Sequence, residues 1–378
     1  MKILLIEASI YGHHLEYIHH IYQWMENYPQ YKLQLVLPPA FKSEKNIYQW
    51  KDLKNVSIAF VPQNNIDKIV QSKGIRKLFL LTLMMRHYIK AYKPDSVFIL
   101  HIYNYIPFFF IIPRYTKVYG IIYQIYLYRW EQMKWLKRIV NITHYYLMKI
   151  YPNIKGVYIL NDNSAASYFN RKFHTEKFIF LPDPINDYSY KGVSLRDRMN
   201  ISVSDTVFLH FGMMDERKGT IHLLNAVRLL SLESRKNKVF IFAGAIQDDI
   251  KNEFYEILES LKSESRIFVY DYFIDNEFLI DLCVTTDYIV IPYKTTDLSS
   301  GVLGYASLYG KKVIGPAGGL IGKLIRKYRL GVSINVTPMV LSKALEKVSH
   351  NESEVQSNYK QIHNVKKFCE VIFKSLSS

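Results

Sequence analysis

Two adjacent cationic side chains follow a glycine-containing loop in the second half of the chain. The run Phe211-Gly212-Met213-Met214-Asp215-Glu216-Arg217-Lys218-Gly219 comes after an apolar stretch and opens a helical stretch, Thr220–Leu232. Gly212 permits a tight turn close to a ligand. Positive charge at a helix start is unfavourable unless an anion such as a diphosphate neutralises it. Arg217 and Lys218 therefore predict a diphosphate site, with a solvated basic first turn as the alternative.

A second segment with anion-binding character follows the predicted strand that ends at Ile291. Asp297, Ser299, Ser300, Gly301 and Val302 come before another predicted helix. Either serine would be the N-cap of that helix, and Gly301 would let a ligand approach the backbone. Hydroxyls and free amides at a helix start form an anion site, although an ordinary N-cap explains the same pattern. A glycine loop, Gly315–Gly319, follows the next predicted strand.

Histidines follow two predicted strands of the first half. His13 and His14 come after the strand Lys2–Ile6, where they would contact a sugar or an acceptor, or form a surface pair. His101 ends another strand and is either a structural hydrogen-bonding group or a site residue. His19 and His20 are expected on a helix surface.

The sequence contains no Asp-x-Asp motif and no Cys/His group with zinc spacing. We therefore expect neither a metal-held diphosphate nor a cofactor.

Alternation of strands and helices along the chain predicts an α/β protein. The predicted strands are Lys2–Ile6, Leu33–Leu37, Val56–Phe60, Ser96–Leu100, Tyr119–Tyr123, Gly156–Leu160, Val207–Phe211, Val239–Ala243, Ile267–Tyr270, Tyr288–Ile291 and Lys312–Gly315. Leu181-Pro182-Asp183-Pro184 interrupts the pattern, and the polar stretch to Ser204 is predicted to be a linker. Two doubly wound sheets would then present their carboxyl edges to a cleft between two domains.

We expect three parts in the chain of 378 residues. Residues 1–185 would form an acceptor-side domain and residues 186–350 a domain that binds the nucleotide sugar. Residues 351–378 would form a C-terminal helix that packs back on the first domain.

The whole chain has a net charge of +16. Most of this net positive charge lies in the first half. Residues 1–190 contain 24 Lys and Arg against 12 Asp and Glu, whereas residues 191–378 contain 25 against 21. The excess suggests an anionic partner for the first half, such as lipid headgroups, a phosphorylated acceptor or nucleic acid, or a compositional habit of the genome. The segment Lys73–Arg86 joins basic residues to apolar ones, and Ile102–Ile112 and Tyr115–Trp130 are rich in aromatics. Peripheral contact with an anionic membrane is one interpretation, and the core of an α/β domain is the other.

Cysteine content and apolar runs bear on the compartment. The only cysteines are Cys283 and Cys369, which fits a reducing environment. The start of the chain lacks signal-peptide features, and no apolar run is long enough to span a bilayer. We therefore expect a cytoplasmic protein that contacts at most the inner face of the cell membrane.

The run from Phe211 to about Ile334 resembles the donor half of GT-B glycosyltransferases, specifically the retaining glycosyltransferase family 4. Four pieces match in order: the Gly…Arg-Lys-Gly loop, Ala243-Gly244, Tyr288–Pro292, and Ala306–Ile314 leading to Gly318-Gly319. In the first half Gly12-His13-His14, Pro94-Asp95…His101 and Leu181–Pro184 resemble the family more loosely. The resemblance implies a GT-B fold with two Rossmann-like domains and a nucleotide-sugar donor.

The resemblance also implies roles for individual residues. Arg217 and Lys218 would bind the donor diphosphate, and the backbone after Ser300 would hold the distal phosphate. Asp297 stands where the family has a glutamate near the donor sugar. Gly12 would border the pyrophosphate, and His101 would lie near the sugar or the acceptor hydroxyl.

Two positions depart from the family pattern. The glutamate that grips the nucleotide ribose is replaced by Tyr305, which cannot chelate two hydroxyls. The carboxylate expected after the glycine pair is replaced by Gly322. These changes leave the nucleotide open, and they motivate a catalytically inactive sugar-nucleotide-binding partner subunit as an alternative function.

The sequence thus favours a retaining, metal-independent glycosyltransferase of polysaccharide biosynthesis acting on a glycan or lipid-linked acceptor. A nicotinamide-dependent oxidoreductase would require Gly-x-Gly-x-x-Gly after the first strand, where only Gly12 occurs. A basic nucleic-acid-binding protein is a further alternative, but no recognition motif of that class appears, so we expect no nucleic-acid partner.

Overall fold

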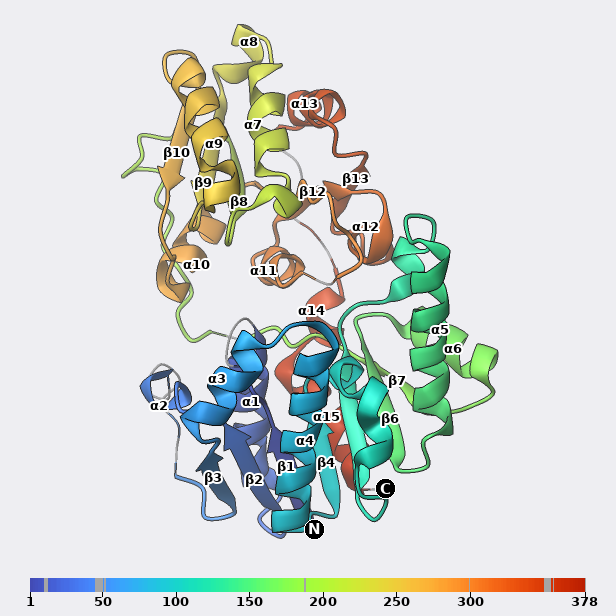
Figure 1. Ribbon diagram of the computed structural model, residues 1–378. Coiled ribbons are helices and arrows are strands. Elements are labelled where there is room, and N and C mark those ends of the chain that lie inside the picture. The colour runs from blue at the N-terminus through green and yellow to red at the C-terminus, as the bar shows by residue number, and fades with distance from the viewer. Residues whose placement is uncertain are drawn as a thin grey trace. The chain divides into compact units, whose positions relative to one another are not determined.

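The computed structural model describes residues 1–9, 13–44, 50, 52–186, 188–298, 300–349, 355 and 357–377. Gly12, Ser299 and the side chain of His13 lie outside the described residues. The chain divides into two compact units (Figure 1). Unit 1 comprises Met1–Pro184 and Val365–Ser378, and unit 2 comprises Ile185–Asn364.

Unit 1 contains a seven-stranded sheet in the order β3-β2-β1-β4-β5-β6-β7, in which every neighbouring pair is parallel. Its strands are β1 (Lys2–Ile6), β2 (Lys32–Leu37), β3 (Val56–Phe60), β4 (Ser96–Ile99), β5 (Lys117–Ile122), β6 (Ile154–Leu160) and β7 (Phe178–Leu181). Its α-helices are α1 (His13–Trp24), α2 (Phe41–Glu44), α3 (Gln63–Gln71), α4 (Gly74–Tyr92), α5 (Trp135–Ile150), α6 (Asn163–Phe173) and α15 (Val365–Ser377). Short 3₁₀ turns are η1 (Met25–Asn27), η3 (Ile102–Asn104), η4 (Ile106–Ile111) and η5 (Tyr126–Arg129).

Unit 2 contains a six-stranded parallel sheet in the order β10-β9-β8-β11-β12-β13. Its strands are β8 (Thr206–Phe211), β9 (Lys238–Ala243), β10 (Arg266–Tyr270), β11 (Tyr288–Val290), β12 (Lys312–Pro316) and β13 (Gly331–Ile334). Its helices are η6 (Glu216–Lys218), α7 (Thr220–Arg228), α8 (Leu232–Arg235), α9 (Asp248–Leu261), α10 (Asn276–Thr285), α11 (Val302–Leu308), α12 (Gly319–Tyr328), α13 (Pro338–Lys347) and α14 (Tyr359–Ile362). The α/β prediction with two Rossmann-like sheets is confirmed.

The central strands are nearly continuous runs of buried residues, as parallel sheets covered on both faces require. All six residues of β8 are buried, and so are all six of β9. In unit 1 a core beside β1 and β2 combines one face of α1 with one face of α15. The red C-terminal helix therefore lies among the blue N-terminal elements (Figure 1).

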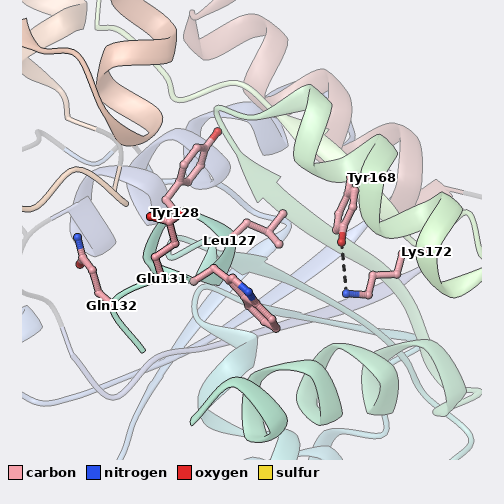
Figure 2. Close-up of a pocket in the computed structure, with 7 residues that line it drawn as sticks. Leu127, Tyr128, Glu131, Gln132, Tyr168 and Lys172 are labelled. Carbon is pink, nitrogen blue, oxygen red and sulfur yellow. Dashed lines mark hydrogen bonds between the residues drawn. The ribbon is translucent and has the colours of Figure 1, made fainter. Parts of the chain in front are cut away.

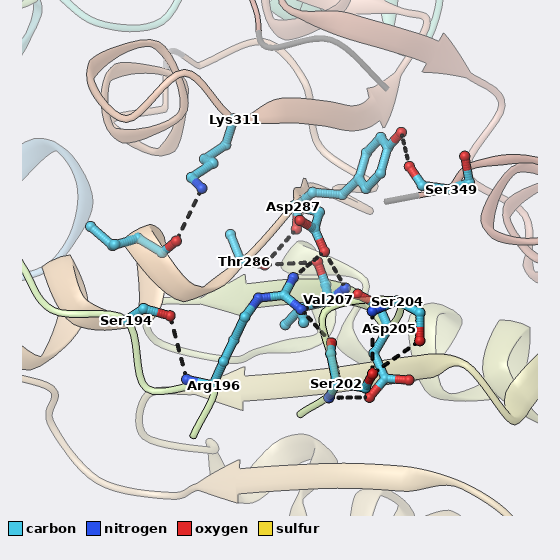
Figure 3. Close-up of polar contacts among 12 residues, drawn as sticks. Ser194, Arg196, Ser202, Ser204, Asp205, Val207, Thr286, Asp287, Lys311 and Ser349 are labelled. Carbon is cyan, nitrogen blue, oxygen red and sulfur yellow. Dashed lines mark hydrogen bonds and ion pairs between the residues drawn. The ribbon is translucent and has the colours of Figure 1, made fainter. Parts of the chain in front are cut away.

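Two predictions about local structure are wrong. His19 and His20 face the core of unit 1 and are less than a tenth exposed, because α1 is buried on more of its circumference than its polar residues suggest. The predicted linker up to Ser204 is bound to unit 2 (Figure 3). Its Arg196 forms a 2.7 Å ion pair with Asp287, and Asp287 also accepts a hydrogen bond from the backbone of Val207 at the start of β8.

Each sheet reverses its strand order once along the chain. In unit 1 the reversal lies between β1 and β4, and in unit 2 it lies between β8 and β11. Loops that leave the carboxyl ends of the two strands at such a point diverge and leave room for a ligand. The histidines of unit 1 follow β1 and β4, the cationic pair of unit 2 follows β8, and the segment with Asp297 and Ser300 follows β11.

Candidate functional site

In unit 2 the loop after β8 brings the Lys218 ammonium against the backbone of Gly212. A Cβ atom on Gly212 would lie 2.6 Å from Lys218 Nζ, so the ammonium is poised directly over this turn. The backbone of Gly212 has a φ of +91°, which favours glycine. Only a residue without a side chain therefore allows the lysine to fold back over the strand end.

The cationic pair lies in the 3₁₀ turn η6 rather than on α7, and Gly219 separates the two elements. The Asp215 carboxylate caps this turn by accepting a 2.8 Å hydrogen bond from the backbone N–H of Lys218, and it lies 3.6 Å from Arg217 Nε. Both cationic side chains remain partly exposed and pass close to the ring of Tyr293, which follows β11.

Burial, together with the neighbouring charge of Arg217, lowers the pKa of Lys218 to about 8, although Asp215 opposes the shift. The ammonium has lost part of its hydration and stands beside a second positive charge. An anion at this place would compensate for the lost hydration and neutralise the second positive charge. The pair is therefore an electrostatically prepared anion site.

The loop after β11 is tied to the loop after β8. The backbone N–H of Lys294 donates a 3.0 Å hydrogen bond to the carbonyl of Arg217. Further along, the Ser300 hydroxyl lies 3.4 Å from the Tyr293 hydroxyl and 3.4 Å from the backbone nitrogen of Val302. The two loops that flank the reversal of the sheet thus share one hydrogen-bonded framework.

Asp297 belongs to the same loop and is 2% exposed. Its neighbour Thr296 accepts a 2.7 Å hydrogen bond from the backbone N–H of Leu320, at the start of α12. The glycine loop after β12 is therefore fixed against the segment that contains Asp297. In this way the carboxyl ends of β8, β11 and β12 bring together the three segments that the sequence singled out.

The backbone around Gly322 leaves no room for a side chain at this position. A Cβ at this position would lie 2.3 Å from the carbonyl oxygen of Ala317, because the first turn of α12 packs against the end of β12. No carboxylate can occupy the position without moving that backbone. The departure from the family pattern therefore reflects close packing of helix and strand.

Tyr305 lies on α11 and points toward the segment that enters unit 2. Its hydroxyl is 3.0 Å from the hydroxyl of Tyr188, and its ring stacks on the Tyr188 ring with a centroid distance of 6.2 Å. Its ring also meets that of Phe211 edge to face at 5.6 Å. The tyrosine is thus an aromatic packing residue with a polar tip, and Gly301 and Val302 form the preceding turn of the same short helix.

In unit 1 a carboxylate–imidazole pair joins Glu7, in the loop after β1, to His14 at the start of α1; the sequence analysis named His14 but not Glu7. Glu7 Oε2 lies 3.2 Å from His14 Nδ1, and Glu7 Oε1 accepts hydrogen bonds from the backbone nitrogens of Ala8 and Ser9 at 2.8 and 3.0 Å. The backbone contacts fix the carboxylate, which lies beside the imidazole. The position of Glu7 directly after β1 was the available signal.

His101 follows β4 and meets His14 through Tyr123. The Tyr123 ring stacks on His14 with a centroid distance of 5.9 Å and meets His101 edge to face at 5.5 Å. Burial lowers the pKa of His101 to about 4, and His14 adds to the shift while Glu7 opposes it. The Asn104 side-chain nitrogen lies 3.3 Å from His101 Nδ1. An amide that donates there places the proton of the neutral ring on Nε2.

The Tyr123 hydroxyl is buried and has no hydrogen-bond partner among the described residues. Burial, together with Glu7 and Asp183, raises its pKa well above the usual value, so the group is a neutral phenol. His14, His101 and Tyr123 together form a polar cluster at the reversal of the unit 1 sheet. Such a cluster can bind a hydroxylated molecule.

A separate pocket of about 540 Å³ lies beside η5 in unit 1 (Figure 2). Tyr128, Trp130 and Tyr168 contribute aromatic surface, and Lys172 donates a 3.3 Å hydrogen bond to the Tyr168 hydroxyl. The sequence analysis named no residue of this pocket as a site residue.

Of the residues predicted from the sequence, Arg217, Lys218, Asp297 and Ser300 come together in unit 2, and His14 and His101 come together in unit 1. Gly12, Ser299 and the His13 side chain lie outside the described residues. Within the described part of the chain, no three His, Cys, Asp or Glu side chains gather closely enough to hold a metal ion.

No family model and no curated protein matches the sequence. Solved structures match along the whole chain. HepE from Anabaena, solved in complex with UDP-glucose, has a TM-score of 0.68 at 16% identity, covering 100% of this chain and 99% of that one. A glycosyltransferase from Rickettsia africae has a TM-score of 0.65 at 14% identity, covering 99% and 97%.

The fold is shared with a protein of another activity. The UDP-GlcNAc 2-epimerase from Methanocaldococcus jannaschii has a TM-score of 0.62 at 12% identity and covers 100% of this chain and 99% of its own. At these identities the likeness extends to the architecture and not to the chemistry. With its two parallel Rossmann-like sheets and these full-length matches, the chain has the GT-B glycosyltransferase fold that its sequence motifs predicted.

Proposed function

We propose that this protein is a glycosyltransferase that moves a sugar from a nucleotide-sugar donor to a glycan or lipid-linked acceptor. The observation that carries the proposal is the cationic pair Arg217 and Lys218 at the reversal of the unit 2 sheet. Lys218 is partly desolvated and folded over Gly212, where a diphosphate would relieve its charge. HepE, which was solved with UDP-glucose, has the same fold and so supports a nucleotide-sugar donor.

The chemistry follows from where charge develops. When the bond between the anomeric carbon and the diphosphate oxygen breaks, negative charge builds up on the departing nucleoside diphosphate. Arg217 and Lys218 would neutralise that charge without a metal ion. Ser300 and the backbone after it would hold the distal phosphate, and Asp297 would face the donor sugar.

Unit 1 would supply the acceptor side. His14 lies beside the Glu7 carboxylate, and neutral His101 would present an Nε2–H donor. Imidazoles that line a site suit hydrogen bonds with a sugar hydroxyl. The family resemblance supports retention of the anomeric configuration, with the donor phosphate assisting removal of the acceptor proton. Anomeric proton coupling in the product distinguishes retention from inversion.

Binding of the donor is the first requirement of this proposal. A thermal-shift panel of nucleoside diphosphates and nucleotide sugars tests it, because a ligand that binds only the folded state raises the melting temperature by mass action. We expect one nucleotide family to raise the melting temperature of the wild type and to have much less effect on Lys218→Ala. A panel without any shift would contradict the proposal.

A catalytically inactive sugar-nucleotide-binding subunit is the second candidate. Tyr305 favours it, because its hydroxyl already contacts Tyr188 and cannot chelate a ribose as a carboxylate does. This candidate predicts a thermal shift without any release of nucleoside diphosphate.

A further inference from the structure

Helix α5 of unit 1 turns an apolar face to solvent. Six large apolar or aromatic side chains on it are between 45% and 66% exposed: Trp135, Leu136, Ile139, Val140, Tyr146 and Ile150. Their spacing of three, four and seven residues places them on one side of a helix. We call this set the α5 stripe. An ordinary surface helix presents its polar side to water, so the α5 stripe requires an explanation.

The orientation of α5 is fixed by its opposite side. Tyr145 is fully buried, and its ring lies 4.3 Å from that of Phe169 and 5.0 Å from that of Tyr126, measured between centroids. Met148 is buried as well. The helix is therefore anchored in unit 1 by a small aromatic core, and the α5 stripe is left on the outside.

Charge around the α5 stripe has one sign. The helix contains Lys137, Arg138 and Lys149 and no acidic residue, and Lys134 precedes it. Lys149 Nζ lies 5.5 Å from the centroid of the exposed Tyr146 ring, so a cation stands at the border of the apolar surface. Near the C-terminal end, burial and, to a smaller extent, the neighbouring charges of Lys155 and Lys149 lower the pKa of Lys177 to about 8, so three lysines gather there.

The segment Lys73–Arg86, which the sequence suggested for membrane contact, exposes less apolar surface than α5 does. In α4 the residues Leu81, Met84, Met85 and Ile89 are buried in unit 1, which is the core alternative. Ile75, Phe79 and Leu83 are exposed at intervals of four residues, but the line ends at the polar His87 and two of its members are less than 40% exposed. The structure therefore moves the candidate surface from residues 73–86 to α5.

We propose that the α5 stripe docks on the surface of an anionic lipid bilayer, with α5 lying in the plane of the interface. Aliphatic side chains would enter the boundary between headgroups and acyl chains, Trp135 and Tyr146 would lie at headgroup level, and the lysines would meet lipid phosphates. None of the described helices has the length and apolar character to cross a bilayer, so the contact is peripheral. The proposal does not depend on the reaction that the protein catalyses.

A second copy of the chain is the other partner that an apolar face suggests. Symmetric pairing through the α5 stripe would bring Lys137, Arg138 and Lys149 of both copies together, and α5 has no carboxylate to neutralise them. Lipid phosphate supplies the complementary charge, which favours the bilayer.

Co-sedimentation of the full chain with vesicles tests the proposal. We expect binding to vesicles of phosphatidylcholine with phosphatidylglycerol at low salt, weaker binding at high salt because exposed charges are screened, and little binding to pure phosphatidylcholine. The double variant Leu136→Glu/Ile139→Glu removes two aliphatic anchors and should weaken binding at least about tenfold. Leu232→Glu in unit 2, an equally exposed leucine, is the matched control and should bind as the wild type does.

A second measurement locates the contact. Vesicles with brominated acyl chains should quench the fluorescence of Trp135 on binding, and Trp135→Phe should remove the quenched component while circular dichroism shows an unchanged fold. The proposal is overturned if the protein stays in the supernatant with anionic vesicles at low salt, or if Ile75→Glu rather than the α5 variant abolishes binding. It is also overturned if light scattering shows a dimer that the α5 variant dissociates.

Discussion

Lys218 combines a proposed role in donor binding with an unusual electrostatic setting. Its ammonium is partly desolvated, stands beside Arg217 and approaches the backbone of Gly212. These features lower its pKa to about 8, whereas a free lysine titrates near 10.5. The protein therefore destabilises the charged form of this lysine in the absence of ligand. A bound diphosphate would return the missing charge partner and raise the pKa again.

This setting predicts how binding depends on pH. Below a pKa of about 8 the free protein already holds the proton on Lys218, so the affinity for a fully ionised nucleoside diphosphate should be flat. Above it the proton must be taken up on binding, and affinity should fall by up to about tenfold per pH unit. Calorimetric titration of UDP from pH 7 to 9.5 measures this. Lys218→Ala should bind weakly and lose the decline, and an equal decline in that variant would assign it to another group.

The glycine loop shows at the level of elements how packing constrains the site. Strand β12 ends against the first turn of α12, and Gly322 is the point of closest approach. The same loop is held to Thr296 by the backbone of Leu320. Glycine at position 322 is therefore explained by the close packing of strand and helix.

A pair of alanine substitutions tests that junction. Gly322→Ala would place a Cβ 2.3 Å from a backbone oxygen, which should cost about 1–3 kcal/mol of unfolding free energy and outweigh the gain in helix propensity. Gly318→Ala is the matched control, because the nearest atom to its Cβ would be 4.0 Å away. Urea denaturation compares the two. Equal midpoints for both variants would show that the junction tolerates a side chain.

Elements with strong local signals could be predicted from the sequence, and long-range partners could not. Consecutive residues were enough to identify the buried runs of β1, β8 and β9, and also the Arg-Lys pair. The edge strands β7 and β13, four residues each, were not predicted. Tyr123 was missed as a site residue because only the fold brings it to His14, across more than a hundred residues of chain. Glu7 lies seven residues before His14 and was missed although it directly follows β1.

On the scale of the whole molecule, two units with the same kind of sheet offer two different chemistries. Unit 2 presents a pair of cations where its strand order reverses, and unit 1 presents a carboxylate–imidazole pair and a neutral imidazole. Cations suit the charged donor, and imidazole and carboxylate groups suit hydrogen bonds with the hydroxyls of a sugar acceptor. This division of tasks is what the proposed function predicts for a GT-B protein.

The proposed division also predicts activity without a divalent metal. Two cationic side chains would take the place that a metal ion has in enzymes that hold the diphosphate through carboxylates. Turnover in excess chelator should equal turnover without chelator. Loss of activity that magnesium or manganese restores would show that the cationic pair is not sufficient.

The most direct test of the central claim is the release of nucleoside diphosphate from a panel of nucleotide sugars. Wild-type protein should release it from one donor family, slowly with water and faster with an acceptor glycan. Lys218→Ala should reduce release by roughly tenfold to a thousandfold, the effect of losing one charged stabiliser of a leaving group. Lys360→Ala, which removes a lysine of unit 2 outside the site, should leave release unchanged. Equal release by Lys218→Ala, or none from any donor that the wild type binds, would contradict the account.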